Sequence, residues 1–175
     1  QKVILQLEEK QVPYIIKRAP MKCYAGGALR KPAEFLELSK AGTLPVALID
    51  GALYPDSASI MDAIEREFPS HTPLVPSSEA GRRAVDKAAA LERSFSDAWL
   101  VWLTTPPWLP GDAQRAAAFA DALDAIDAHL RAVGSSEEGG GVQPGPYLCG
   151  ATFSLADVKM ASFLERAAAS IPYYR

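Results

Sequence analysis

Asp56 and Ser57 place a carboxylate and a hydroxyl at the predicted start of a helix, where they could bind a doubly charged end group. The unpaired backbone N–H groups of a helix start attract a carboxylate, and the Ser57 hydroxyl can add a hydrogen bond to it. The Asp56 carboxylate attracts an ammonium. Together the two residues could bind the end group of an α-amino acid. The alternative is that Ser57 simply caps the helix, which requires no ligand.

Leu44 and Pro45 begin a predicted strand shortly before that helix. A cis peptide bond between them would turn the N–H and C=O of Leu44 outward, where they could pair with a peptide as a short extra strand. A proline that simply opens an edge strand is the alternative. With a tight turn at Asp50-Gly51 and a helix over residues 57–67, the stretch predicts a strand-hairpin-helix unit whose polar groups gather at one end.

The elements before the hairpin are predicted from shorter patterns. Residues 1–10 favour a helix, a strand begins at about Tyr14, and Pro32 opens a helix that ends at Gly42. The first helix has no strand before it, although a parallel β-α-β unit needs one. We therefore expect a strand before Gln1 to lie in the middle of the sheet, and its absence to leave a gap too wide for backbone pairing.

The composition changes after residues 70–77, a proline-bearing linker, and this change predicts a domain boundary. Before it lies an α/β domain at 1–69, and after it a helical domain at 78–175. Helices are predicted at 79–104, at 112–133 and from 154 to about 168. The last of these opens with a capping box formed by Ser154 and Asp157.

Composition and charge exclude several classes of protein. The net charge is −3, with 49% apolar and 22% charged residues, which is typical of a soluble globular protein. The basic residues are scattered, which disfavours nucleic-acid binding, and no apolar run approaches the roughly 18 residues of a membrane span. Cys23 and Cys149 are too few for a disulfide framework or a zinc site, and His71 and His129 have no paired acid. We expect an intracellular protein with reduced thiols and no metal.

The order and spacing of these motifs resemble the glutathione transferase superfamily. The similarity rests on Gln1-Lys2-Val3, Leu7-Glu8-Glu9-Lys10, Val12-Pro13-Tyr14, Lys31-Pro32, Phe35-Leu36, Leu44-Pro45, Gly145-Pro146-Tyr147-Leu148-Cys149-Gly150 and Phe153-Ser154-Leu155-Ala156-Asp157. Within the superfamily the chain looks like the cysteine-type members, which are the plant-type dehydroascorbate reductases and the lambda and omega transferases. The resemblance implies a thioredoxin-like, glutathione-binding domain at 1–69 that lacks its first strand. It also implies an all-helical domain at 78–175 that is truncated at its end.

The resemblance implies a glutathione site. By position, Lys31 helps to hold glutathione, Leu44 pairs with its cysteinyl backbone, Pro45 is the cis-proline, and Asp56-Ser57 bind its γ-glutamyl end. In these groups the nucleophilic cysteine comes immediately before the residues that match Gln1-Lys2. The catalytic residue is therefore expected upstream of Gln1, where a helix start would stabilise a thiolate.

Other residues are weaker candidates for chemistry. Cys23 and Cys149 are disfavoured as substitutes for the nucleophile, because isolated cysteines are usually small buried hydrophobic residues. Trp99, Trp102 and Trp108 are expected mainly in the core, although one of them could line an acceptor pocket.

The implied activity is that of a glutathione-dependent thiol transferase or dehydroascorbate reductase. Glutathione is its co-substrate and a small oxidised or electrophilic molecule its acceptor. A glutathione-conjugating transferase with an upstream serine or tyrosine is one alternative. A catalytically silent relative that serves as a docking or structural subunit of a larger assembly is another. We expect a monomer or homodimer without nucleic-acid or membrane partners, located in the cytoplasm, or in a plastid after removal of an upstream targeting segment.

Overall fold

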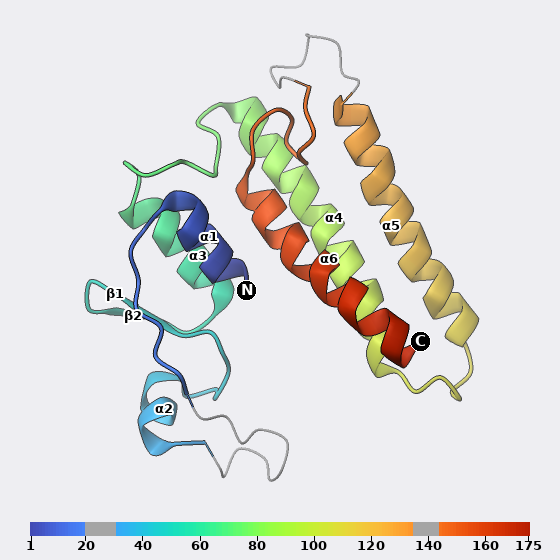
Figure 1. Ribbon diagram of the computed structural model, residues 1–175, viewed down its shortest axis with the longest axis horizontal. Helices are drawn as coiled ribbons and strands as arrows, with labels where there is room; N and C mark the ends of the chain where they lie inside the picture. The colour runs from blue at the N-terminus through green and yellow to red at the C-terminus, as the bar shows by residue number, and fades with distance from the viewer. Residues whose placement is uncertain (20–30, 135–143) are drawn as a thin grey trace. The chain divides into compact units, whose positions relative to one another are not determined.

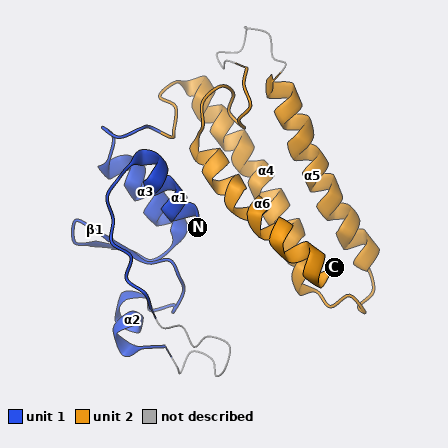
Figure 2. Cartoon of the chain, in the orientation of Figure 1, with its two compact units in different colours: residues 1–73 blue, residues 74–175 orange. Residues whose placement is uncertain are grey.

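The computed structural model describes residues 1–19, 31–134 and 144–175. Contacts divide the chain into two units, residues 1–73 and residues 74–175 (Figure 2), and each unit is described by itself. Cys23, which was weighed as a substitute nucleophile, lies outside the described residues. None of the helices in the described ranges is long and apolar enough to cross a bilayer.

In the described part of unit 1, three helices combine with a two-stranded sheet (Figure 1). Its elements are α1 (Lys2–Lys10), α2 (Ala33–Leu38), β1 (Ala47–Ile49), β2 (Ala52–Tyr54) and α3 (Ser57–Glu67). The strands pair antiparallel, with Ala47 opposite Tyr54. Asp50 and Gly51 both have positive φ, 48° and 83°, as a two-residue type I′ turn requires. The predicted hairpin and the predicted helix that follows it are thereby confirmed.

The predicted strand at about Tyr14 is wrong. Residues 13–19 are assigned to no strand, and Ile15 and Ile16 are 89% and 61% exposed. A strand exists only through hydrogen bonds to a neighbouring strand, and none of the described residues makes a backbone hydrogen bond with this segment. Among the described residues the sheet of unit 1 therefore consists of β1 and β2.

The core of unit 1 is built on α3, because the buried residues of this helix are all apolar. They are Ile60, Met61, Ala63 and Ile64. Val12 and Phe35 add further buried apolar side chains. Because α1 and β2 both contact α3, this helix links the elements of the unit.

Among its described residues, unit 2 has three long helices, with α5 and α6 both packed against α4 (Figure 1). The helices are α4 (Glu79–Thr104), α5 (Asp112–Gly134) and α6 (Leu155–Tyr174). Phe95 and Trp99 of α4, Phe119 of α5 and Met160 of α6 are buried in one hydrophobic cluster. The three helices are those that periodicity predicted.

The end of α6 differs from the prediction, because the helix runs to Tyr174 and not to about residue 168. Pro172 lies inside its last turn. A proline costs the most in the middle of a helix. Pro172 cannot donate to the carbonyl four residues before it, but it disturbs little of the helix because only two helical residues follow it.

The start of α6 is held by Asp157, as the predicted capping box requires. Its Oδ2 accepts hydrogen bonds from the Ser154 N–H at 2.9 Å and from the Ser154 hydroxyl at 2.6 Å. Its Oδ1 accepts from the Leu148 N–H at 2.8 Å. One buried carboxylate thus joins the helix start to the loop before it.

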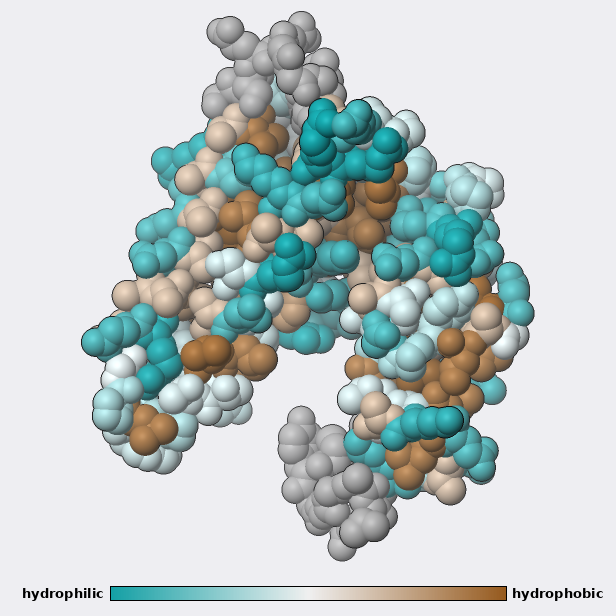
Figure 3. All heavy atoms as spheres, turned by 180° about the vertical axis from the view of Figure 1, so that it is seen from behind, coloured by the Kyte–Doolittle hydropathy of each residue, from teal (hydrophilic) through white to brown (hydrophobic). Residues whose placement is uncertain are grey.

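Large apolar side chains remain on the surface of the chain, as the brown patches of the space-filling view show (Figure 3). In unit 2 Trp108 is 81% exposed, whereas Trp99 is buried. Trp102 is partly buried, with its ring centroid 5.4 Å from that of Phe119. The prediction of a core position is therefore confirmed for Trp99 and Trp102, but it is wrong for Trp108.

Candidate functional site

The hairpin brings four of the predicted site residues to one end. Ala47 is paired with Tyr54, so Leu44 and Pro45 before β1 lie at the same end of the hairpin as Asp56 and Ser57 after β2. The peptide bond between Leu44 and Pro45 is cis, the form expected from the resemblance. The register of the two strands, set by the Asp50-Gly51 turn, is what brings the two pairs together.

Leu44 offers its backbone to a partner. Neither its N–H nor its C=O makes a hydrogen bond to any of the described residues. Its side chain is 55% exposed. An exposed residue with a free donor and a free acceptor, next to a strand, can pair with an extended peptide.

Asp56 is the N-cap residue of α3, so the alternative in which Ser57 merely caps the helix does not hold. The backbone of Asp56 is extended, and its Oδ1 accepts from the N–H groups of Ala58 and Ser59 at 2.9 Å each. The Ser59 hydroxyl donates to Oδ2 at 3.0 Å. These hydrogen bonds, with that of the Ser59 N–H first, lower the pKa of Asp56 and keep it an anion.

Because Asp56 caps the helix, the hydroxyl and the backbone N–H of Ser57 are not needed for capping. Ser57 is half-buried, and neither its hydroxyl nor its N–H makes a hydrogen bond within the described parts of the chain. The N–H belongs to the first residue of α3, where the helix dipole adds a partial positive charge. The start of α3 therefore offers two donors to an anion, beside the negative carboxylate of Asp56.

Lys31 lies against the loop that leads to Leu44. Its Nζ donates to the Gly42 carbonyl at 2.5 Å. The loop is also held by Ser39, which is buried, donates from Oγ to the Thr43 carbonyl at 3.0 Å and accepts from the Thr43 N–H at 3.1 Å. An ammonium has three donors. Lys31 thus lies next to the loop that leads to Leu44, and among the described residues only one of its three donors is bonded.

Ser39 is a residue that sequence reasoning missed. It follows α2 directly, as its C-cap residue, three positions before a glycine with φ of 66°. A serine in such a turn often bonds to nearby backbone groups, and this local pattern was the signal available.

The described residues contain one free cysteine, Cys149, and it is a poor nucleophile. It is buried in unit 2, and burial raises the pKa of its thiol. Only the thiolate attacks, so a raised pKa lowers reactivity at neutral pH. Within the described ranges, His, Cys, Asp and Glu side chains form no cluster of three or more that could hold a metal ion.

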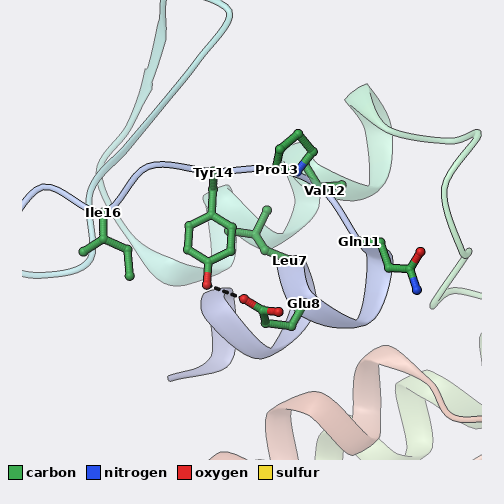
Figure 4. Close-up of a pocket in the computed structure, with 7 residues that line it drawn as sticks. All are labelled: Leu7, Glu8, Gln11, Val12, Pro13, Tyr14 and Ile16. Carbon is green, nitrogen blue, oxygen red and sulfur yellow. Dashed lines mark hydrogen bonds between the residues drawn. The ribbon is translucent and has the colours of Figure 1, made fainter.

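An open hollow of about 600 Å³ lies between α1 and the extended segment that follows it (Figure 4). Leu7, Glu8 and Tyr14 are among its lining residues. The Tyr14 hydroxyl donates to Glu8 Oε1 at 2.5 Å, and this hydrogen bond raises the pKa of Tyr14. The hollow contains none of the predicted site residues, so it is separate from the hairpin end.

Three relatives with named functions align with the whole chain. Glutathione S-transferase DHAR2 of Arabidopsis thaliana is 25% identical, and the chain spans 68% of its length. A probable cytosolic glutathione S-transferase DHAR1 of Oryza sativa is 28% identical, also with 68% of its length covered. A probable chloroplastic DHAR2 of the same species is 26% identical, and the chain spans only 53% of it.

Solved structures share the fold. Glutathione transferase Omega 3C from Trametes versicolor superposes with a TM-score of 0.77 at 23% identity, over 99% of this chain and 70% of that one. A glutathione S-transferase from the Antarctic clam Laternula elliptica gives 0.73 at 20% identity, over 99% and 79%.

Two family models cover the chain from end to end. The N-terminal domain of glutathione S-transferase matches residues 1–67, and the C-terminal domain of glutathione S-transferase matches residues 58–175. The second match alone spans more than half of the chain. The chain belongs to the glutathione S-transferase family.

Proposed function

We propose that unit 1 binds glutathione at the open end of the hairpin, and that the protein is a glutathione-dependent thiol transferase of the dehydroascorbate reductase type. The observation that carries the proposal is the unused pair of donors on Ser57. They lie beside the Asp56 carboxylate and at the same hairpin end as the unpaired backbone of Leu44. These groups complement the charges and the peptide backbone of glutathione.

Each group of glutathione has a partner in this arrangement. The γ-glutamyl carboxylate accepts hydrogen bonds from the Ser57 N–H and hydroxyl, and the adjacent ammonium pairs with Asp56. The cysteinyl N–H and C=O pair with those of Leu44 as a short strand, next to Pro45. Lys31 supplies a cation for the glycyl carboxylate.

The proposed reaction is a thiol-disulfide exchange coupled to a two-electron reduction. Two glutathione thiols supply two electrons and two protons, leave as one glutathione disulfide, and convert dehydroascorbate to ascorbate. The enzyme thiolate and the first glutathione thiol form a mixed disulfide, while dehydroascorbate takes up the two electrons with two protons. The thiolate of the second glutathione then attacks the glutathione sulfur of this disulfide, which releases glutathione disulfide and restores the enzyme thiolate. From the resemblance to the cysteine-type members, we propose that this thiolate belongs to a cysteine upstream of Gln1. Burial makes Cys149 a poor alternative.

Binding to Ser57 is tested by isothermal titration of glutathione into the chain and its Ser57→Ala variant. A hydrogen bond to a charged group contributes about 1.5–3 kcal/mol, so the Kd should rise about 10-fold to 150-fold. Ser94→Ala is the matched control, since Ser94 is exposed on α4 in unit 2. A Kd for Ser57→Ala within twofold of the parent value would remove Ser57 from the site.

The reaction is tested on the full-length polypeptide. Ascorbate formation from dehydroascorbate and glutathione is expected, and it should be lost when the proposed upstream cysteine is replaced by serine. Conjugation of glutathione to an electrophile without ascorbate formation would favour a conjugating transferase. Glutathione binding without either reaction would favour a catalytically silent subunit. The relatives' names support the cytosol or the plastid as the proposed compartment.

A further inference from the structure

The buried face of α1 is polar, which is unusual for a helix packed in a core. Gln6 and Lys10 are the buried residues of this nine-residue helix, at 0% and 1% exposure. They lie one helical turn apart, on the same face. The facing helix α3 presents the apolar residues of the unit's core, so polar groups of α1 enter an otherwise apolar contact.

Each of the two side chains finds hydrogen-bond partners on or just after α3. Gln6 Nε2 donates to the Met61 carbonyl at 3.0 Å and to Glu65 Oε1 at 2.9 Å. Lys10 Nζ lies 3.2 Å from Glu65 Oε2 and donates to the Thr72 carbonyl at 3.1 Å. Glu65 therefore joins both, and we name Gln6, Lys10 and Glu65 the α1–α3 cluster.

The order of these contacts shows that α1 and α3 run parallel. Gln6 meets Met61 and Glu65, whereas Lys10, one turn later, meets Glu65 and then Thr72. The two helix starts therefore lie at the same end of the pair (Figure 1). The first turn of α1 lies at the end where Asp56 and Ser57 begin α3.

Apolar contacts alone would only weakly fix the position of α1 along α3. Hydrophobic attraction has no direction, so a helix can shift along an apolar partner at small cost. Buried hydrogen bonds and ion pairs are directional, and a shift of one turn would leave their charges unpaired in the core. Buried polar groups of this kind are best attested as devices that select one register.

We infer that the α1–α3 cluster fixes the register of α1 along α3, and thereby positions the start of α1 beside the glutathione site at Asp56 and Ser57. The positional part rests on the proposed function, whereas the register part does not. Gln6, Lys10 and Glu65 are positioning residues, since none of them belongs to the hairpin end.

The register is measured by pulsed electron spin resonance between spin labels on Glu9→Cys and Asp62→Cys. Both positions are exposed, one on each helix. The labels are attached in a Cys23→Ser/Cys149→Ala background. One narrow distance distribution is expected with the cluster intact. In the apolar variant Gln6→Leu/Lys10→Met/Glu65→Met the distribution should broaden or shift, and an unchanged distribution would overturn the inference.

The same variants separate positioning from stability. Replacement of a buried ion pair by apolar residues often leaves stability unchanged or raises it. We therefore expect the apolar variant to keep its thermal midpoint while its Kd for glutathione rises at least fivefold. Glu79→Met/Arg83→Met, which removes an exposed ion pair of α4, is the matched control and should leave the Kd unchanged. A Kd that the apolar variant leaves unchanged would overturn the positional part.

Two further results allow the inference to be tested even if the apolar variant does not fold or the parent chain does not bind glutathione. Should the apolar variant fail to fold, Gln6→Leu alone removes two hydrogen bonds and leaves Lys10 paired with Glu65, and it should still broaden the distribution. A parent chain that does not bind glutathione would refute the proposed function. The distances between the labels would still decide the register.

Discussion

Replacement of Asp157 by alanine should destabilise unit 2 strongly. The Asp157 carboxylate accepts from the N–H groups of Leu148 and Ser154 at 2.8 and 2.9 Å. Leu148 and Ser154 are 3% and 2% exposed, so water cannot readily replace the lost acceptor. Alanine at position 157 would leave both backbone donors buried and unpaired, and it would also remove the acceptor of the buried Ser154 hydroxyl.

The expected loss follows from the number of orphaned donors. A buried donor without a partner costs about 1–3 kcal/mol, so two of them cost about 2–6 kcal/mol. A domain of this size is stable by about 5–15 kcal/mol in total. The loss is therefore a large fraction of the stability of unit 2.

Urea unfolding followed by tryptophan fluorescence measures this loss. All three tryptophans of the chain, at positions 99, 102 and 108, lie in unit 2, so the signal reports on that unit. Asp124→Ala on the exposed side of α5 is the matched control and should stay within about 0.5 kcal/mol of the parent. A loss below about 1 kcal/mol for Asp157→Ala, or one equal to that of the control, would refute the reasoning.

Two further predictions concern the loop at Lys31 and the buried thiol. Gly42→Ala should lower the thermal midpoint of unit 1 in circular dichroism more than Gly51→Ala does. Both glycines have positive φ, but an added Cβ at Gly42 meets Lys31 Nζ at 2.8 Å, so this flexible end must move and its hydrogen bond to the Gly42 carbonyl is disturbed. At Gly51 an added Cβ meets nothing within 4 Å. Equal decreases of the thermal midpoint in the two variants would contradict the contact of Lys31 with Gly42. Because burial raises the pKa of Cys149, a Cys23→Ser chain should react with a disulfide reagent at least tenfold more slowly when folded than in urea. Equal rates would show that the thiol is accessible.

The helices were predictable wherever local signals mark both ends. For α4 the periodicity begins after Ser78, whose side chain caps the helix, and stops before the proline pair at 106–107. For α6 the capping box marked the start, whereas no local signal marked the end, and the helix runs past Pro172 to Tyr174. Local rules predict a helix end well when cap and breaker agree.

The site was predictable as a set of residues but not in its hydrogen bonding. The Asp-Gly turn and the two short strands fix which residues share an end of the hairpin. Which member of the pair Asp56 and Ser57 caps α3 depends on backbone angles that neighbouring residue types do not determine. The α1–α3 cluster was not predictable, because Gln6 and Lys10 find their partners more than fifty residues further along the chain.

The extended segment of residues 13–19 makes no backbone hydrogen bond to any described residue. Ile15 and Ile16 also expose their apolar side chains, and an extended segment of this kind can pair with a strand. Lys17 and Arg18 follow them directly, so two copies of the chain aligned in parallel would set like charges against each other. In that parallel register, the charges of Lys17 and Arg18 therefore oppose pairing of the segment with a copy of itself.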